Sequence, residues 1–362
     1  MKAKKINRAF LSLVLIMILI GFLSFLSASL GKIGQDVSIF SQLVLKQFLI
    51  LILGLGVFFI VANIDYKIWR RYALFVFATS ILLMILIMIP GLGVKSGGAM
   101  RWLHLGPFTF QPAELLKYGF VFYWAAWLAT AKTKIKDLRW GMLPLLFLLG
   151  LTGGLLYCQP DTGTLMVIAG TGIIMYFTAG CRWRDLGVII LVGSLTLSAM
   201  VYYRPYLRGR ILTYLNPTQD LLGASYQVNQ SLIAIGAGGI YGRGFGQSTQ
   251  KFSFLPQPMS DSIFSITAEE FGFIGSLIII LLFLTFTVLG LRIAIRAPDI
   301  FGRLLAVGIV ILIVAQSFIN IGAMLALLPL TGLPLIFFSQ GGSALLLSLL
   351  GAGVILNISR YC

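Results

Sequence analysis

Only eleven acidic side chains stand beside 27 lysines and arginines in this chain of 362 residues, so each carboxylate can be judged by its surroundings. Asp261 ends a polar stretch, LPQPMSDSIF, directly before a long apolar run. A carboxylate at such a boundary can have a raised pKa and act as a general base. It can equally be the N-cap of a helix that begins at Ile263. Position alone leaves both roles open.

Two other carboxylates have local partners. Glu114 lies three residues before Lys117 in QPAELLK, on the same face of a helix, and this spacing favours a structural ion pair over direct catalysis. Asp161 in QPDTGT is expected to cap the following helix by accepting hydrogen bonds from the backbone N–H of Gly163 or Thr164. A position facing a cavity is compatible with either role.

The remaining acids have weaker claims. Glu269 and Glu270 are adjacent, so on a helix they point about 100° apart and we expect at most one to face a cavity. Four others lie in loops next to Lys or Arg and are interpreted as solvated loop charges: Asp65, Asp137, Asp185 and Asp299. Asp36 and Asp220 have ordinary turn or loop roles.

The composition indicates an integral membrane protein. Hydrophobic residues make up 59% of the chain and charged residues only 10%, whereas soluble proteins carry about 25% charged residues. A spanning helix needs about 20 mostly apolar residues and satisfies its own backbone hydrogen bonds. This criterion predicts an all-α membrane protein with about ten transmembrane helices. The expected spans are roughly 9–30, 43–64, 72–92, 110–131, 141–158, 162–180, 186–203, 263–291, 303–328 and 333–358.

Positive charge sets the predicted orientation of the spans. Most of the 27 Lys and Arg fall in the N-terminal segment and in alternate loops, which the positive-inside rule assigns to the cytoplasm together with both termini. The stretch 9–30 is longer than the apolar core of a signal peptide, about 7–15 residues, so we expect it to remain as a span. The scattered charge does not form the single basic face that a nucleic-acid partner needs.

One connection, 204–262 between the predicted seventh and eighth spans, is much longer than the others. Connections of this length usually carry function. Apolar clusters alternate with glycines in it, and residues 231–235 can form an amphipathic helix. We therefore predict a large, ordered and partly helical outer loop over an outward-facing cavity, within a single polytopic domain, 1–362.

The outer loops are rich in cations. Arginine binds phosphate oxygens in a bidentate manner, so such a surface suits a lipid-linked phosphate or diphosphate. The cations concerned are Lys95, Arg101, Arg204, Arg208, Arg210, Arg243 and Lys251.

Several kinds of site are not supported. His104, the only histidine, falls in a loop, and no plausible Ser/His/Asp set includes it, which argues against a hydrolase triad. Cys158, Cys181 and Cys362 lie in different segments without metal-ligand spacing, which argues against a disulfide framework and a zinc site. No Walker or dinucleotide-binding motif follows a strand. We expect no tightly bound cofactor, and a divalent cation stays possible as a companion of a diphosphate.

Five strings, in order, resemble the SEDS family (shape, elongation, division and sporulation) of bacterial cell-wall polymerases, which includes FtsW, RodA and SpoVE. They are GGAMRWLHLGPFTFQPAELLK, QPDTGT, YQVNQSLIAIGAGGIYGRGFGQSTQKFSFLP, SDSIFSITAEEFGFIG and NIGAMLALLPLTGLPLIFFSQGGSALL. The run SLIAIGAGGIYGRGFGQS looks closest to FtsW. The resemblance implies a peptidoglycan glycosyltransferase of the bacterial inner membrane that polymerises lipid II into glycan strands. It further implies a class B penicillin-binding protein and other divisome or elongasome membrane proteins as partners.

The resemblance also implies roles for individual residues. The family's catalytic aspartate precedes the eighth span and matches Asp261, which favours the general base over the N-cap. The Glu/Lys pair of the family matches Glu114 and Lys117, and its PDxGT aspartate matches Asp161. Candidates for holding the diphosphate leaving group are Arg101, Arg210, Arg243 and Lys117.

This chain departs from the family pattern close to the aspartate. Where relatives commonly read LPEPHTDFIFA, it has Gln257, Met259 and Ser262, and in the C-terminal motif it has Ile336 and Gln340. These changes raise the possibility of altered substrate preference or reduced activity. Two alternatives to a polymerase stay open: a lipid II flippase, for which no inverted repeat is visible, and a non-catalytic division scaffold.

Overall fold

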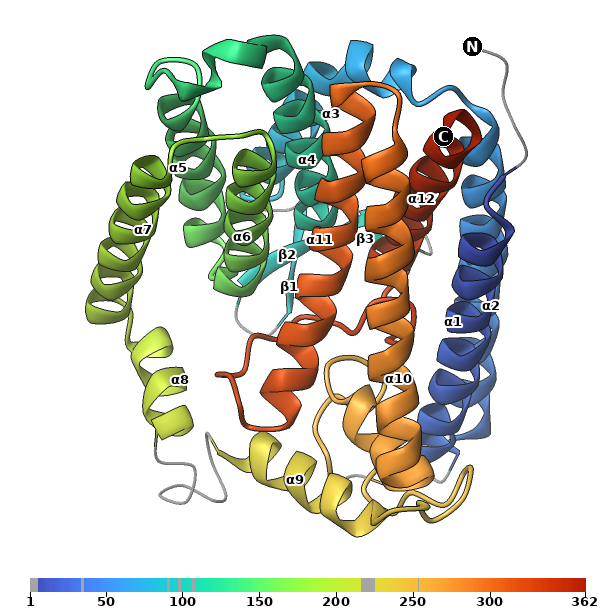
Figure 1. Ribbon diagram of the computed structural model, residues 1–362. Coiled ribbons are helices and arrows are strands. Elements are labelled where there is room, and N and C mark those ends of the chain that lie inside the picture. Colours follow the sequence, from blue (N-terminus) through green and yellow to red (C-terminus); the bar gives the residue numbers. More distant parts are fainter. Residues whose placement is uncertain are drawn as a thin grey trace.

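The computed structural model describes residues 6–33, 36–89, 92–96, 99–105, 108–215, 225–252 and 254–362. In this part of the chain, twelve α-helices and one small sheet form a single bundle (Figure 1). The helices are α1 (Arg8–Ser29), α2 (Val37–Asn63), α3 (Lys67–Leu86), α4 (Pro112–Ala131), α5 (Met142–Cys158), α6 (Thr162–Thr178), α7 (Trp183–Tyr203), α8 (Pro205–Leu215), α9 (Tyr226–Gly238), α10 (Ile263–Arg296), α11 (Ile300–Met324) and α12 (Gly342–Ile358).

The bundle is that of a multi-pass membrane protein. Each of the ten expected spans coincides with a helix, α1 to α7 and α10 to α12. Seven helices of the described chain are long and apolar enough to cross a membrane. Helices α5 and α6 are apolar but have 17 residues each, and α4 carries Glu114 and Lys117. The all-α membrane fold is therefore confirmed, whereas the total of ten spans stays a prediction.

Helix α11 is the centre of the bundle. It contacts α4, α6, α10 and α12, and 78% of its most apolar window is buried. Gly308 allows the close approach, since a Cβ there would lie 2.6 Å from both Val121 of α4 and Met175 of α6. Small residues at helix contacts serve this purpose in membrane bundles. Polar side chains of α11, among them Gln316 and Asn320, are consequently buried in the bundle.

Two parts of the chain differ from the helical prediction. Three short strands between α3 and α4 form an antiparallel sheet: β1 (Gly93–Ser96), β2 (Ala99–Leu105) and β3 (Phe108–Phe110). The predicted spans 303–328 and 333–358 are wrong at their facing ends, because α11 ends at Met324 and α12 begins at Gly342. Pro329 and Pro334 lack a backbone N–H and Gly332 has a φ of +70°, so the segment between the two helices cannot continue either one.

The long outer connection is partly helical, as predicted. It contains α8 and α9, and α9 includes the expected amphipathic residues 231–235. Figure 1 shows α9 across the end of the bundle that lies opposite the C-terminus. Asp220 and the side chain of Lys95 lie outside the described residues.

Helix α10 is bent at Gly272, whose φ of 66° and ψ of −159° are not helical. The loop after α9 satisfies the backbone groups that the bend leaves open: Phe273 N–H donates to Gly239 O (2.8 Å), and Gly244 N–H donates to Glu270 O (2.9 Å). A Cβ on Gly272 would lie 2.4 Å from the nitrogen of Gly242. The glycine-rich loop and the bend therefore form one unit.

Candidate functional site

Asp261 lies in the loop that leads into α10, where hydrogen bonds fix both Asp261 and the preceding Ser260. The Ser260 hydroxyl donates to its Oδ1 (2.8 Å), and the Asn320 amide of α11 donates to its backbone oxygen (2.7 Å). The Ser339 hydroxyl donates to the backbone oxygen of Ser260 (2.6 Å). Ser262 occupies the N-cap position of α10 and makes no capping hydrogen bond with its side chain. Asp261 thus does not cap α10, and its carboxylate is left for another task.

The surroundings of Asp261 make it more basic than an ordinary aspartate. Burial raises its pKa, while the Ser260 hydroxyl and then Arg210 and Arg101 lower it and Asp161 raises it slightly; the net shift is upward. Burial has this effect because it penalises the charged form of a carboxyl group. A raised pKa is what a general base needs to accept a proton effectively.

Asp261 and Arg210 line the same cavity, whose volume is about 370 Å³. Arg210 belongs to α8, and its guanidinium lies over the Tyr206 ring, 4.5 Å from the centroid. The cavity is closed on another side by the segment 328–332. Gly332 stands between the two charged groups, because a Cβ built on it would be 3.6 Å from Asp261 Oδ2 and 3.8 Å from Arg210 Nη2. A reacting group can therefore contact the carboxylate and the guanidinium at once.

Arg101 and Asp161 extend the charged site. From β2, Arg101 donates through Nε to Gln159 O (3.2 Å) and through Nη2 to Pro160 O (2.5 Å). Asp161 accepts hydrogen bonds from the Thr164 N–H (3.1 Å) and the Thr164 hydroxyl (2.9 Å), so its predicted capping of α6 is confirmed. Both charges act on the pKa of Asp261. The sheet thus brings Arg101 to the residues that directly precede α6.

Glu114 and Lys117 form a buried ion pair, with Lys117 Nζ 2.8 Å from Glu114 Oε2. The ammonium also donates to the side-chain oxygen of Gln316 on α11, and the amide of Gln316 donates to Pro334 O (3.1 Å). Lys117 does not line the cavity of Asp261. Through Gln316 the pair is linked to Pro334, in the connection between α11 and α12, and its burial as an ion pair agrees with the structural role that the spacing predicts.

Arg243 lies apart from this cavity. Its Nη1 is 3.1 Å from Glu269 Oε1 and donates to the Thr249 hydroxyl (2.9 Å). Glu269 is fully buried and also accepts from the Thr249 N–H (3.1 Å) and the Ser248 hydroxyl (2.5 Å). The structure therefore does not bring Arg243 together with Arg101 and Arg210.

The neighbouring Glu270 has its own cation. Lys251 Nζ lies 2.9 Å from Glu270 Oε1 and donates to Gly246 O (2.8 Å), and the Ser27 hydroxyl of α1 donates to both carboxylate oxygens. Both Glu269 and Glu270 are buried, and neither lines the cavity of Asp261 or the cavity at the end of α1, which agrees with the expectation that at most one faces a cavity. The loop 239–251 wraps around the start of α10 and gives each carboxylate a partner.

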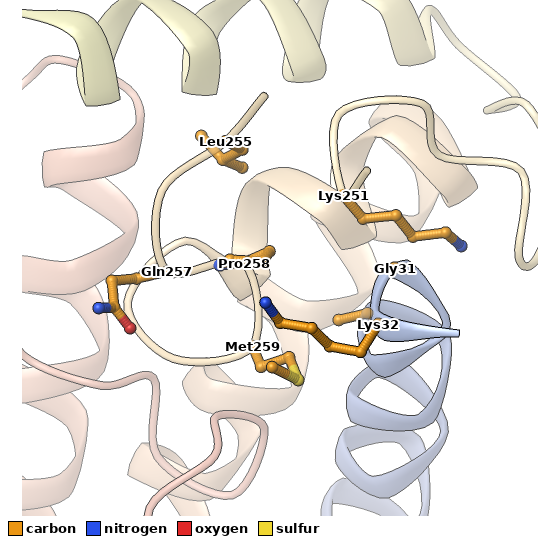
Figure 2. A pocket seen from close by; sticks show the side chains of 8 residues that line it. Gly31, Lys32, Lys251, Leu255, Gln257, Pro258 and Met259 are labelled. Carbon is orange, nitrogen blue, oxygen red and sulfur yellow. The ribbon is translucent and has the colours of Figure 1, made fainter. Parts of the chain in front are cut away.

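A second cavity, of about 280 Å³, lies between the end of α1 and the loop 251–259 (Figure 2). Gln257 and Met259 line it, and neither lines the cavity of Asp261. In Figure 2 the ammonium of Lys251 points away from Gln257. These two departures from the common pattern therefore contribute no side chain to the walls of the Asp261 cavity.

Several site residues were not singled out from the sequence: Asn320, Ser260, Ser339, Gln316 and Gly332. All except Gln316 belong to the five motif strings of the sequence. The motifs therefore marked these regions, but they did not show which of their residues lie near Asp261. Among the described residues, no group of three or more His, Cys, Asp and Glu is placed to hold a metal ion.

The sequence profile of the FtsW, RodA and SpoVE proteins, described as "Cell cycle protein", matches residues 7–362. The chain belongs to this family. Among its relatives, stage V sporulation protein E of Bacillus subtilis (strain 168) is 39% identical over 351 residues, which are 96% of this chain and 95% of that protein. A probable peptidoglycan glycosyltransferase FtsW of Geobacter metallireducens is 40% identical over 315 residues, 87% and 84% of the two chains.

Solved structures of the FtsW/RodA/SpoVE family have the same fold. One is a chain from a study of the structural coordination of polymerization and crosslinking by a peptidoglycan synthase complex; it has a TM-score of 0.81, 30% identity and 98% coverage of both chains. The rod shape determining protein RodA of Thermus thermophilus has a TM-score of 0.72 at 27% identity, covering 99% of this chain and 98% of its own. The bundle described above is thus the family's architecture over the whole chain.

Proposed function

We propose that this FtsW/RodA/SpoVE-family protein is a peptidoglycan glycosyltransferase that polymerises lipid II, with Asp261 as its general base. One observation carries the proposal: Asp261 and Arg210 face a common cavity of about 370 Å³ at the end of the bundle covered by α9. This places a proton acceptor beside a group that binds phosphate oxygens. The names of the relatives, probable peptidoglycan glycosyltransferases, agree with this chemistry.

The proposed reaction needs a single carboxylate. Asp261 takes the proton of the 4-hydroxyl of the acceptor sugar, and that oxygen attacks the anomeric carbon of the growing strand. The bond from this carbon to the diphosphate oxygen breaks, its electron pair stays on undecaprenyl diphosphate, and the configuration inverts. The diphosphate leaves without protonation, so no second acid is required. The raised pKa of Asp261 suits the proton transfer.

Arg210 and Arg101 are the proposed ligands of the diphosphate. Both lie close enough to Asp261 to act on its pKa, and both can stabilise the negative charge that grows on the leaving group. A divalent cation is a possible companion of the diphosphate, and no step above is routed through one. Lys117 and Arg243, which are paired with glutamates, are assigned supporting roles instead.

The proposed setting is the outer face of the bacterial inner membrane, with both termini in the cytoplasm. The distribution of Lys and Arg supports this orientation. We also propose a class B penicillin-binding protein as partner, together with other membrane proteins of division or elongation. The similarity to a chain studied in a complex that couples polymerisation to crosslinking supports such a partner.

The decisive experiment compares Asp261→Asn with the wild type in polymerisation of purified lipid II, with and without a class B partner. Loss of a general base lowers the rate by about 10²–10⁴-fold. Asp137→Asn is the matched control, because Asp137 is exposed and far from the cavity. An unchanged polymer yield from Asp261→Asn contradicts the proposal. Translocation of lipid II across liposomes without polymer would identify a flippase instead.

A further inference from the structure

A third cavity is lined by residues of α4, of α5 and of the connection between them. Figure 1 shows this connection at the end of the bundle that carries the C-terminus, away from α9. It has a volume of about 350 Å³ and is built from the last turns of α4 and the first turns of α5. Its walls include Tyr123, Trp127, Arg139, Leu143 and Phe147. None of these residues takes part in the glycosyltransferase site, so the cavity needs a separate explanation.

The cavity opens towards the bilayer. Leu143 and Phe147 lie one turn apart on α5, and they are 50% and 70% exposed. Such a pair on an apolar helix of a membrane protein faces acyl chains rather than water. A molecule that enters the cavity therefore needs an apolar part that lies along α5.

The opposite rim is polar and basic. The connection from α4 to α5 contains four cations and one acid, all exposed: Lys132, Lys134, Lys136, Arg139 and Asp137. Within the described residues, Arg139 makes no hydrogen bond or ion pair, while its side chain lines the cavity. The site thus offers a guanidinium in a surrounding of net positive charge.

Two tryptophans indicate where this rim lies along the membrane normal. Trp127 and Trp140 are stacked with ring centroids 5.9 Å apart, and the Trp127 indole N–H donates to Trp140 O (3.0 Å). The Lys134 ammonium lies 5.1 Å from the centroid of the Trp140 ring. Tryptophans gather at the headgroup level of membranes, so Arg139 stands where lipid phosphates are found.

We propose that this cavity binds one anionic phospholipid of the bilayer, with its phosphodiester on Arg139 and an acyl chain along Leu143 and Phe147. The indole of Trp127 packs against the glycerol region. Basic pockets between spanning helices select anionic headgroups, and each nearby Lys or Arg contributes about 1 kcal/mol, equivalent to about a fivefold preference. The site is independent of the proposed glycan chemistry at the other end of the bundle.

The test uses a photo-crosslinker placed in the cavity. The full-length protein with Leu143→p-benzoylphenylalanine is reconstituted in nanodiscs of phosphatidylglycerol and phosphatidylcholine in equal amounts, irradiated and analysed by mass spectrometry. We expect the crosslinked lipids to favour phosphatidylglycerol by about fivefold. Arg139→Gln should remove most of this preference, because Arg139 is the only one of the four described cations of the connection that lines the cavity. Arg184→Gln removes an exposed arginine near the same end of the bundle, from α7, and should leave the preference intact.

Two results would overturn the proposal. One is a ratio of crosslinked phosphatidylglycerol to phosphatidylcholine that equals the ratio in the bilayer. This result would have to be found in the otherwise unchanged protein with the label at Leu143 and also with the label one turn further along α5, at Phe147. The other is a preference that persists in Arg139→Gln. The same labels used in native membranes also decide the class of occupant, since crosslinks to a polypeptide in place of lipid would contradict a phospholipid site.

Discussion

Replacing Gly332 with alanine should separate catalysis from folding. Its φ of +70° is a left-handed conformation, which costs an L-residue about 1–2 kcal/mol. The added methyl would lie 3.6 Å from Asp261 Oδ2 and 3.8 Å from Arg210 Nη2. These are ordinary van der Waals distances, so the protein should still fold. The methyl would, however, fill the space in which a reacting group contacts both side chains.

The expected effect on catalysis is large. A displacement of about 1 Å from the productive geometry can lower the rate about 100-fold, and a methyl group between the base and the phosphate-binding arginine displaces the substrate by at least that much. The assay is the initial rate of polymerisation of purified lipid II, measured together with the thermal unfolding midpoint in detergent. We expect Gly332→Ala to lower kcat/KM by about 100-fold.

Gly180→Ala is the control for backbone strain. Gly180 has a φ of +92°, and a Cβ there would meet no atom within 4 Å. It therefore carries a comparable conformational penalty without touching the cavity. Similar stability losses in both variants, with loss of polymerisation only in Gly332→Ala, would support the proposed site. If Gly332→Ala polymerised lipid II as fast as Gly180→Ala, the space between Asp261 and Arg210 would not be where the reaction takes place.

Three further outcomes follow from the charges. Asp261 must be deprotonated to act as a base, so kcat/KM should fall as the pH decreases. Because burial raises the pKa of Asp261, this fall should begin at a higher pH than an ordinary aspartate would give. A kcat/KM that stays constant down to pH 4 would contradict this. Lys117→Met should lower the free energy of unfolding by about 3–5 kcal/mol, because it leaves Glu114 buried without its cation. Adding Glu114→Leu to this variant should restore much of the lost stability in unfolding experiments. Arg243→Gln should lower the free energy of unfolding by about 1–3 kcal/mol, and the same substitution should have a smaller effect in a protein that already carries Glu269→Gln. Additive losses in this double-mutant cycle would argue against a contact between the two side chains.

The local features of this protein could be predicted from its sequence. The apolar runs predict where the spanning helices lie, because a segment in the bilayer must satisfy its own backbone hydrogen bonds. The capping of α6 by Asp161 and the pairing of Glu114 with Lys117 involve residues three positions apart on one helix face or turn. Such contacts depend only on helix geometry. Asp261 needed the resemblance in addition, since its position allowed two roles.

The remaining features depend on how distant segments fold together. Glu269 and Glu270 would diverge on an isolated helix, yet the loop 239–251 wraps around the start of α10 and provides cations for both. The convergence of Arg210 with Asp261 requires α8 to lie beside the segment 328–332. The separation of Arg243 from Arg210 likewise depends on how distant segments fold together, because Arg243 is bound to Glu269 of α10. A count of basic residues in an outer loop cannot show which of them already has a carboxylate partner.

The bend in α10 relates the site to the thickness of the membrane. A straight helix of 34 residues would be about 50 Å long, whereas the hydrocarbon core is about 30 Å thick. Residues beyond Gly272 alone make up about 36 Å, enough to cross it. Spanning helices adapt to thicker or thinner bilayers by tilting. Because the glycine-rich loop is hydrogen-bonded to α10 on both sides of Gly272, the bend couples the spanning part of α10 to the part joined to Asp261, so a change in the tilt of the spanning part should also move the site.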